Sequence, residues 1–140
     1  IGGTALKPMA DGSFTLGDRK MKFADGNPAT AAINNVDGSV TRLTLVTEWT
    51  PIAADLTALA GDWHSEEAQA TVKFAVEGDK AFITQRPSTK LPLRPIYKDH
   101  FSTPGYVVWV TRDSAGKIDR LHVGGPRMRD MPFTRVAVKP

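Results

Sequence analysis

The sequence predicts an all-β fold, an antiparallel barrel or sandwich with one short helical turn near residues 51–60. Segments that alternate apolar and polar residues recur along the chain, as strands with one buried face do. Turn residues separate these segments at close spacing, and the 140 residues include 12 Gly and 10 Pro. Only the Ala- and Leu-rich stretch at residues 51–60 has a helical composition, with Asp55 as a capping residue and Gly61 at its end.

The strands are clearest in the second half of the chain. Residues 72–76 place their apolar side chains on one face, and residues 81–83 follow a Gly-Asp turn as the hairpin partner. Residues 106–111 form a continuous β-favouring run, and residues 117–123 return as its antiparallel partner. Residues 131–136 then predict a closing strand. Several short strands joined by tight turns are typical of antiparallel barrels and sandwiches.

The composition narrows the function classes. The composition, with 41% hydrophobic and 24% charged residues, is typical of a soluble globular domain. No run approaches about 18 apolar residues, so we expect no membrane span. The absence of Cys excludes disulfides, thiolate metal sites and a cysteine nucleophile. The net charge is +3, and the bases are interspersed with acids, which favours solvated strand faces over a nucleic-acid interface.

An internal repeat relates the two halves of the chain. Leu6-Lys7-Pro8 recurs 87 residues later as Leu93-Arg94-Pro95, and Phe14 matches Phe101 at the same spacing. Alternating apolar residues match as well, because Met21 and Phe23 align with Val108 and Val110 at the same spacing of 87 residues. Agreement of apolar positions in order indicates two related β units.

The repeat also predicts how the chain is divided. Residues 38–45 match residues 116–123, after nine extra residues that we interpret as a longer loop in the first copy, around Asn27-Pro28 and Asn34-Asn35. We expect an incomplete first β repeat at residues 1–54 and a C-terminal barrel repeat at residues 55–140. The alternative is that residues 1–54 complete one continuous barrel body with the rest.

The alignment of the two copies predicts which side chains are buried. Met21 and Phe23 should belong to the core. The later match makes a second set of expectations: Leu43 and Leu45 buried like Leu121 and Val123, Arg42 and Arg120 exposed, and His122 pointing outward.

Trp109 lies on the other face of its strand, where the first copy has Lys20 and Lys22. An indole can bury roughly 150–250 Å², and a bare one beside Val107 would be an interaction liability. We therefore expect residues 1–50 to cover Trp109, or Trp109 to mark a docking surface for an absent partner domain.

The candidate binding residues are polar or aromatic. Tyr97, Asp99 and His100 lie between two predicted strands and could line the mouth of a barrel, a common small-molecule site. The alternative is a polar loop that leads to the core residue Phe101. His64 and Trp109 complete the set of candidates.

No catalytic or metal site follows from the polar residues. In His64-Ser65-Glu66-Glu67, neighbours on a strand would point to opposite faces, which favours a loop over a nucleophile–base pair. The three histidines, His64, His100 and His122, lack the spacing of metal ligands, so we expect no metal.

Packing and turn motifs recur in a characteristic order between residues 56 and 136. They are Leu56-x-x-Leu59-Ala60-Gly61-Asp62-Trp63-His64-Ser65-Glu66-Glu67, the Val72 hairpin, Leu91-Pro92-Leu93-Arg94-Pro95, Phe101, Thr111-Arg112-Asp113-x-x-Gly116 and Phe133-Thr134-Arg135-Val136. In this order they resemble the C-terminal domain of bacterial β-lactamase-related serine hydrolases of the D-aminopeptidase type. The resemblance implies a lipocalin-like antiparallel barrel of about eight strands.

The resemblance also implies a function. It suggests a serine hydrolase whose catalytic domain lies N-terminal to Ile1, in a periplasmic or secreted location. The family's nucleophile motif, Ser-x-x-Lys, has a literal match at Ser114-Ala115-Gly116-Lys117, but this match falls in a predicted hairpin loop. We therefore expect a non-catalytic accessory domain, without a cofactor, that packs on the catalytic domain or shapes access to its site. The alternative is a lipocalin-like barrel that binds a small molecule.

Overall fold

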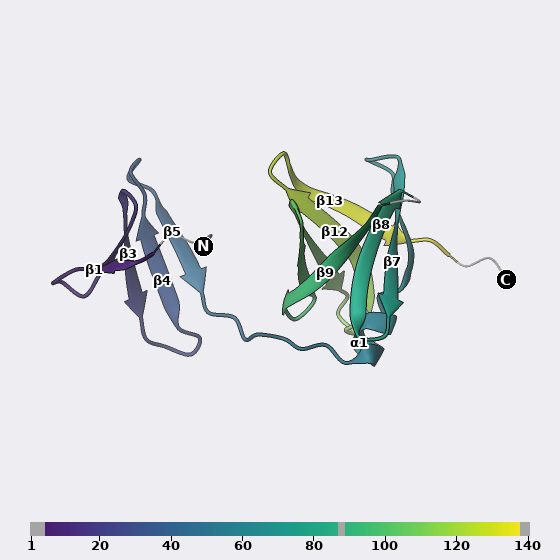
Figure 1. The fold of residues 1–140 in the computed structure, drawn as a ribbon, viewed down its shortest axis with the longest axis horizontal. Helices are drawn as coiled ribbons and strands as arrows, with labels where there is room; N and C mark the ends of the chain where they lie inside the picture. Colours follow the sequence, from purple (N-terminus) through teal and green to yellow (C-terminus); the bar gives the residue numbers. More distant parts are fainter. Residues whose placement is uncertain (1–4, 87–88, 138–140) are drawn as a thin grey trace. The chain divides into compact units, whose positions relative to one another are not determined.

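A computed structural model describes residues 5–86 and 89–137. The chain forms two compact units, Ile1–Val46 and Thr47–Pro140, which are coloured purple to blue and blue to yellow in Figure 1. The division lies ahead of residue 54, because Trp49 already packs on the core of the second unit.

The second unit is a closed antiparallel barrel of eight strands (Figure 1). In chain order the strands are β6 (Gly61–Ser65), β7 (Ala70–Glu77), β8 (Lys80–Arg86), β9 (Thr89–Tyr97), β10 (His100–Thr103), β11 (Tyr106–Arg112), β12 (Ile118–Gly125) and β13 (Met128–Arg135). Each strand pairs with the next, and β13 closes the barrel against β6 through Thr134–His64 and Arg135–Trp63. The predicted all-β barrel is confirmed. Its strands all come from residues 61–135, so residues 1–54 do not complete it.

One half of the barrel interior is filled by large side chains. Trp63, Phe74 and Phe101 are each fully buried, and Phe74 and Phe101 meet edge to face with ring centroids 5.7 Å apart. They follow the alternation of the strands, since Lys73, next to Phe74, is exposed.

A short helix, α1 (Ala53–Thr57), closes this end of the barrel. It is shorter than the predicted 51–60, although Asp55 caps it by accepting a hydrogen bond from the Ile52 N–H at 3.1 Å. Leu56 and Leu59 bury themselves in the barrel core.

Arg135 fixes the helix to the barrel. Its guanidinium donates to the carbonyl oxygens of Ala58 and Ala60, at 2.6 and 2.8 Å, and lies 4.5 Å from the centre of the Trp63 ring. The last carbonyls of the helix thus find donors on the closing strand.

The first unit is a five-stranded antiparallel sheet that does not close (Figure 1). Its strands, in chain order and in sheet order, are β1 (Lys7–Pro8), β2 (Phe14–Leu16), β3 (Arg19–Ala24), β4 (Thr30–Asn34) and β5 (Val40–Thr44). Four buried side chains form its small core: Leu16, Met21, Ala31 and Ile33.

The strand pairing shows the repeat in a different register from the predicted one. Phe14 faces Met21 and Phe101 faces Val108, so β2–β3 and β10–β11 match at the predicted 87-residue spacing. Beyond this point the spacing becomes 90 residues. The pairs Met21–Ile33 and Ala31–Leu43 then correspond to Val108–Val123 and Leu121–Phe133.

This register changes the interpretation of residues 27–35. They contain β4, the counterpart of β12, and are not the extra loop that the sequence suggested. Residues 38–45 accordingly match β13 instead of residues 116–123. The first unit thus corresponds to the last five strands of the barrel, β9–β13.

Burial corrects the predictions made from the old register. Leu121 is fully buried and Val123 half-buried, but Leu43 is only half-buried and Leu45 is 69% exposed. Phe23, predicted as core, is 50% exposed. The reason is that an open sheet has no opposite wall to cover its apolar side chains, on the central strand β3 as well as at the edge strand β5. The predictions for Met21, which is buried, and for the exposed Arg42 and Arg120 are confirmed.

Candidate functional site

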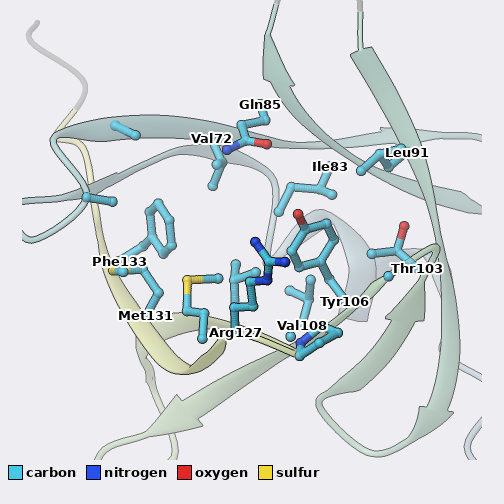
Figure 2. Close-up of a pocket in the computed structure, with 17 residues that line it drawn as sticks. Val72, Ile83, Gln85, Leu91, Thr103, Tyr106, Val108, Arg127, Met131 and Phe133 are labelled. Atoms are coloured by element: carbon cyan, nitrogen blue, oxygen red, sulfur yellow. The ribbon is translucent and has the colours of Figure 1, made fainter.

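The barrel contains a cavity of about 550 Å³ at the end away from α1 (Figure 2). Residues of the β10–β11 and β12–β13 turns line it, including Gly105, Pro126 and Arg127. Sites for small molecules typically have volumes of roughly 300–1,000 Å³, so this space is large enough to hold one.

Along two of the strands, the inward-facing side chains become smaller toward this end, which leaves room for the cavity. Along β7 the inward positions are Phe74, then Val72, then Ala70, and the last two line the cavity. Along β12 the same face carries Leu121, then Val123, then Gly125. Each step of two residues therefore removes side-chain volume from the interior.

The wall of the cavity is mainly apolar. Aliphatic side chains come from most of the strands, and Met128 and Met131 add flexible thioether surface. The other large apolar lining residues are Val72, Ile83, Leu91, Val108, Val123 and Phe133.

Four polar side chains interrupt this wall: Gln85, Thr103, Tyr106 and Arg127. Among the described residues that line the cavity, Arg127 alone is charged, and its guanidinium projects toward the cavity between Met131 and Tyr106 in Figure 2. Within residues 5–86 and 89–137, Arg127 forms no ion pair. Thr103 Oγ1 is buried and has no hydrogen-bond partner.

Gly125 leaves the room that Tyr106 occupies. A Cβ atom at Gly125 would lie 2.9 Å from Tyr106 Cδ1 and 3.2 Å from the Gly105 carbonyl oxygen. Any larger residue would therefore displace the Tyr106 ring from the mouth of the cavity.

The five side chains predicted to bind a ligand lie elsewhere, since Tyr97, Asp99, His100, His64 and Trp109 do not line this cavity. The structure does bring Tyr97, Asp99 and His100 together at the β9–β10 turn, as expected. However, this turn lies at the end of the barrel where α1 packs, opposite the cavity, and a ligand site there stays a prediction.

Asp99 has a structural partner there. It forms an ion pair with Arg112. The hydrogen bonds to Asp99, and secondarily its charge, raise the pKa of the Arg112 guanidinium above its ordinary value.

Four rings form a stack on the outer face of β9–β12. Neighbouring ring centroids are 4.0 Å apart for Tyr97–His100, 6.3 Å for His100–Trp109 and 5.2 Å for Trp109–His122. The half-buried Trp109 thus lies between two histidines of the barrel itself, and its cover by residues 1–50 or by a partner domain stays a prediction. His122 does lie on the outer face, as predicted, but it is only 8% exposed because it packs under Trp109.

His122 also joins a hydrogen-bonded chain that the sequence did not reveal. Its Nδ1 lies 2.7 Å from Asp130 Oδ1 and its Nε2 lies 3.2 Å from Thr111 Oγ1. With the proton on Nδ1, the imidazole donates to the carboxylate and accepts from the hydroxyl. The order carboxylate–imidazole–hydroxyl is that of a catalytic triad. None of the three residues lines the barrel cavity, however, and they connect three neighbouring strands.

His64 and Ser65 lie on opposite faces of β6, and Ser65, expected in the loop that follows, is the last residue of this strand. Ser65 is buried, and its Oγ accepts a hydrogen bond from the Ala68 N–H at 3.2 Å. His64 points the other way, with Nδ1 3.0 Å from Thr71 Oγ1 and Nε2 3.5 Å from Glu66. His64 and Ser65 therefore form no nucleophile–base pair.

Ser114 lies in the β11–β12 hairpin loop, as expected, whereas Lys117, expected at the start of the return strand, is the last residue of this loop. The Asp113 carboxylate organises this loop by accepting hydrogen bonds from the backbone N–H groups of Ala115 and Lys117, both at 2.9 Å.

Comparison with family models finds no match, and neither does comparison with curated proteins. Among the described residues, no group of three or more His, Cys, Asp or Glu side chains is placed to hold a metal ion. In the same part of the chain, no helix has the length and apolar character needed to cross a membrane.

Proposed function

We propose that the barrel binds a small, mainly apolar molecule in the cavity at its open end. The cavity itself carries this proposal. A barrel that serves only for packing can fill its interior with side chains, as the half near α1 does. In the other half, the side chains shrink along two strands and leave about 550 Å³ behind a mainly apolar wall. An apolar molecule would gain free energy by leaving water for this space.

The test is binding of a neutral apolar fluorophore, N-phenylnaphthylamine, to the full chain. We expect saturable enhancement of its emission. Ala70→Phe should abolish this enhancement, because the new ring fills the cavity from β7.

The matched control is Ala75→Phe, which puts the same ring on the opposite face of β7, outside the barrel. This variant should bind like the original chain. Urea-unfolding midpoints measured on both variants show whether each is folded. No saturable binding by the original chain, or equal binding by a folded Ala70→Phe variant, contradicts the proposal.

An accessory role in a serine hydrolase is the second candidate, and it rests on the resemblance of residues 56–136. It is favoured by the exposed apolar side chains of the first unit, among them Phe23, Val40 and Leu45. Exposed apolar side chains such as these would gain free energy by burial against another protein segment. The periplasmic or secreted location stays a prediction on the same ground.

The sequence encoded upstream of Ile1 tests this second candidate. A Ser-x-x-Lys motif on a predicted helix there would support it, and a complete upstream sequence without a hydrolase domain would contradict it.

A further inference from the structure

We infer that the molecule bound in the barrel has an apolar body and one anionic group, such as a carboxylate, and that Arg127 binds this group. The inference rests on the proposed function and adds the chemical class of the ligand. Three features of the cavity support it: the charge of its lining, the hydrogen-bonding character of its polar groups, and their small number.

The charge of the lining is that of a single cation. Arg127 stands in the turn between β12 and β13, and it is the one ionisable residue besides the Tyr106 phenol among the lining residues. Within the described ranges no carboxylate pairs with it. A guanidinium presents its N–H groups as a planar fork that matches a carboxylate, so a ligand carboxylate would supply the missing partner.

Acidic residues near the same end of the barrel do not change the positive charge of the cavity lining. Glu66 and Glu67 belong to the loop between β6 and β7, but neither lines the cavity. Glu66 lies next to His64 and Gln69 instead. A cationic ligand would therefore enter against Arg127 with no carboxylate in the lining to receive it.

The neutral polar groups, which can both donate and accept hydrogen bonds, are compatible with an acceptor. The hydroxyls of Tyr106 and Thr103 and the amide of Gln85 can all donate hydrogen bonds into the cavity wall. Thr103 Oγ1 is buried without a partner, which costs free energy that a ligand oxygen within reach would recover. A carboxylate offers only acceptor atoms, so it suits this set of donors.

The small number of polar groups limits the rest of the ligand. A sugar or a nucleotide needs a hydrogen-bond partner for most of its polar atoms, and a polyanion needs several cations. This cavity offers one cation and three neutral polar side chains within an otherwise apolar wall. The class that fits is an apolar monocarboxylate, for example an alkanoate or an arylalkanoate.

The experiment compares ligands that share one alkyl chain and differ in the head group. Decanoate, decanol and decyltrimethylammonium compete with N-phenylnaphthylamine for the full chain at neutral pH, below the concentrations at which they form micelles. Decanoate should compete at about tenfold lower concentration than decanol, which is the effect of one charge-assisted pair at a partly exposed site. The cationic analogue should be the weakest competitor.

Substitutions then assign the effect to one side chain. Arg127→Gln should bring decanoate to the level of decanol, and Arg127→Lys should keep part of the preference. The matched control is Arg129→Gln, because Arg129 is a nearby exposed arginine that does not line the cavity. This control should leave the preference unchanged.

Failure of this inference can be distinguished from failure of the proposed function. If the fluorophore binds but decanoate and decanol compete equally, the anionic class is wrong and the binding barrel stands. If Arg127→Gln keeps the preference for decanoate, Arg127 is not the group that binds it. If neither the fluorophore nor any competitor binds, the proposed function itself fails.

Discussion

Asp99 accepts two parallel hydrogen bonds from Arg112, one from Nε at 2.8 Å and one from Nη2 at 2.7 Å. The Asp99 backbone is in the left-handed region, with φ of +64°, and its carbonyl oxygen accepts a bond from the Val110 N–H at 3.0 Å. Arg112 also donates to the Gly116 carbonyl oxygen at 3.0 Å. The Asp99–Arg112 ion pair thus connects the β9–β10 turn to the β11–β12 turn, at the end of the barrel where α1 packs.

The Asp99–Arg112 pair should contribute measurably to stability. We expect Asp99→Asn to lower the free energy of unfolding by about 1 kcal/mol, because Asn tolerates the left-handed backbone but removes the charge. Asp99→Ala should cost about 1 kcal/mol more, since Ala is strained at this φ. Urea unfolding measures both changes. Asp119→Asn is the control, because the Asp119–Arg120 pair is long, at 3.7 Å, and exposed.

Alanine substitutions of Leu121 and Leu45 distinguish the register of the repeat in the structure from the register predicted from the sequence. Leu121→Ala should destabilise the barrel by roughly 2–5 kcal/mol, because the side chain is fully buried. Leu45→Ala should have almost no effect on the unfolding of its own unit, because Leu45 is 69% exposed. Chemical denaturation measures the free energy of unfolding of both variants. Comparable losses of this free energy would support the register predicted from the sequence.

The two units should differ in their ability to fold alone. Residues 47–140 contain a closed barrel with a continuous core, so we expect this fragment to give a dispersed amide NMR spectrum. In the first unit, residues 5–46 as described have four buried apolar side chains and two open sheet edges, which is too little to stabilise a sheet. A dispersed spectrum from residues 1–46 alone would contradict this expectation.

Acid should weaken the first unit through two aspartates. Hydrogen bonds from Lys20 and then Ser13 hold the pKa of Asp11 well below its ordinary value of 3.8, and hydrogen bonds from Ser39 lower the pKa of Asp37. Both carboxyl pKa values are thus lower in the folded state than in the unfolded chain. The stabilisation is complete above pH 3.8 and is lost as the pH falls below this value, because the unfolded chain then takes up protons first.

An NMR titration of the carboxyl carbons measures these pKa values directly. Ser39→Ala should move the pKa of Asp37 back toward 3.8 and leave the Asp11 titration unchanged, so Asp11 serves as the internal control. A normal titration of Asp37 in the unsubstituted chain would refute the assignment.

Strand content and barrel architecture were predictable because local alternation survives in the fold. Residues 72–76 and 81–83 pair as expected, and so do residues 106–111 and 117–123. The match of residues 38–45 to residues 116–123 failed because β-strands of similar composition look alike. Pairing between strands distinguishes β12 from β13, and this information is not present in any one segment.

The site was not predictable for a different reason. Their polar character suggested Tyr97, Asp99 and His100 as residues that line a barrel mouth. However, which end of the barrel is open depends on closure of the barrel and on the position of α1. A usable signal was present in the size of the alternating residues. Phe74, Val72 and Ala70 decrease in volume toward one end of their strand, which indicates where the interior is left empty.

The adjacent glycines Gly124 and Gly125 have a further consequence. A Cβ on Gly124 would lie 3.0 Å from Trp109 Cζ3, on the outside of the barrel, just as one on Gly125 would meet the Tyr106 ring at the cavity. Two aromatic rings therefore touch the same short stretch of backbone from opposite sides. At Gly124 and Gly125, no side chain of β12 separates either ring from the backbone. We expect a molecule that displaces Tyr106 to shift this backbone against the indole on its other side, so that Trp109 fluorescence would report when the cavity is occupied.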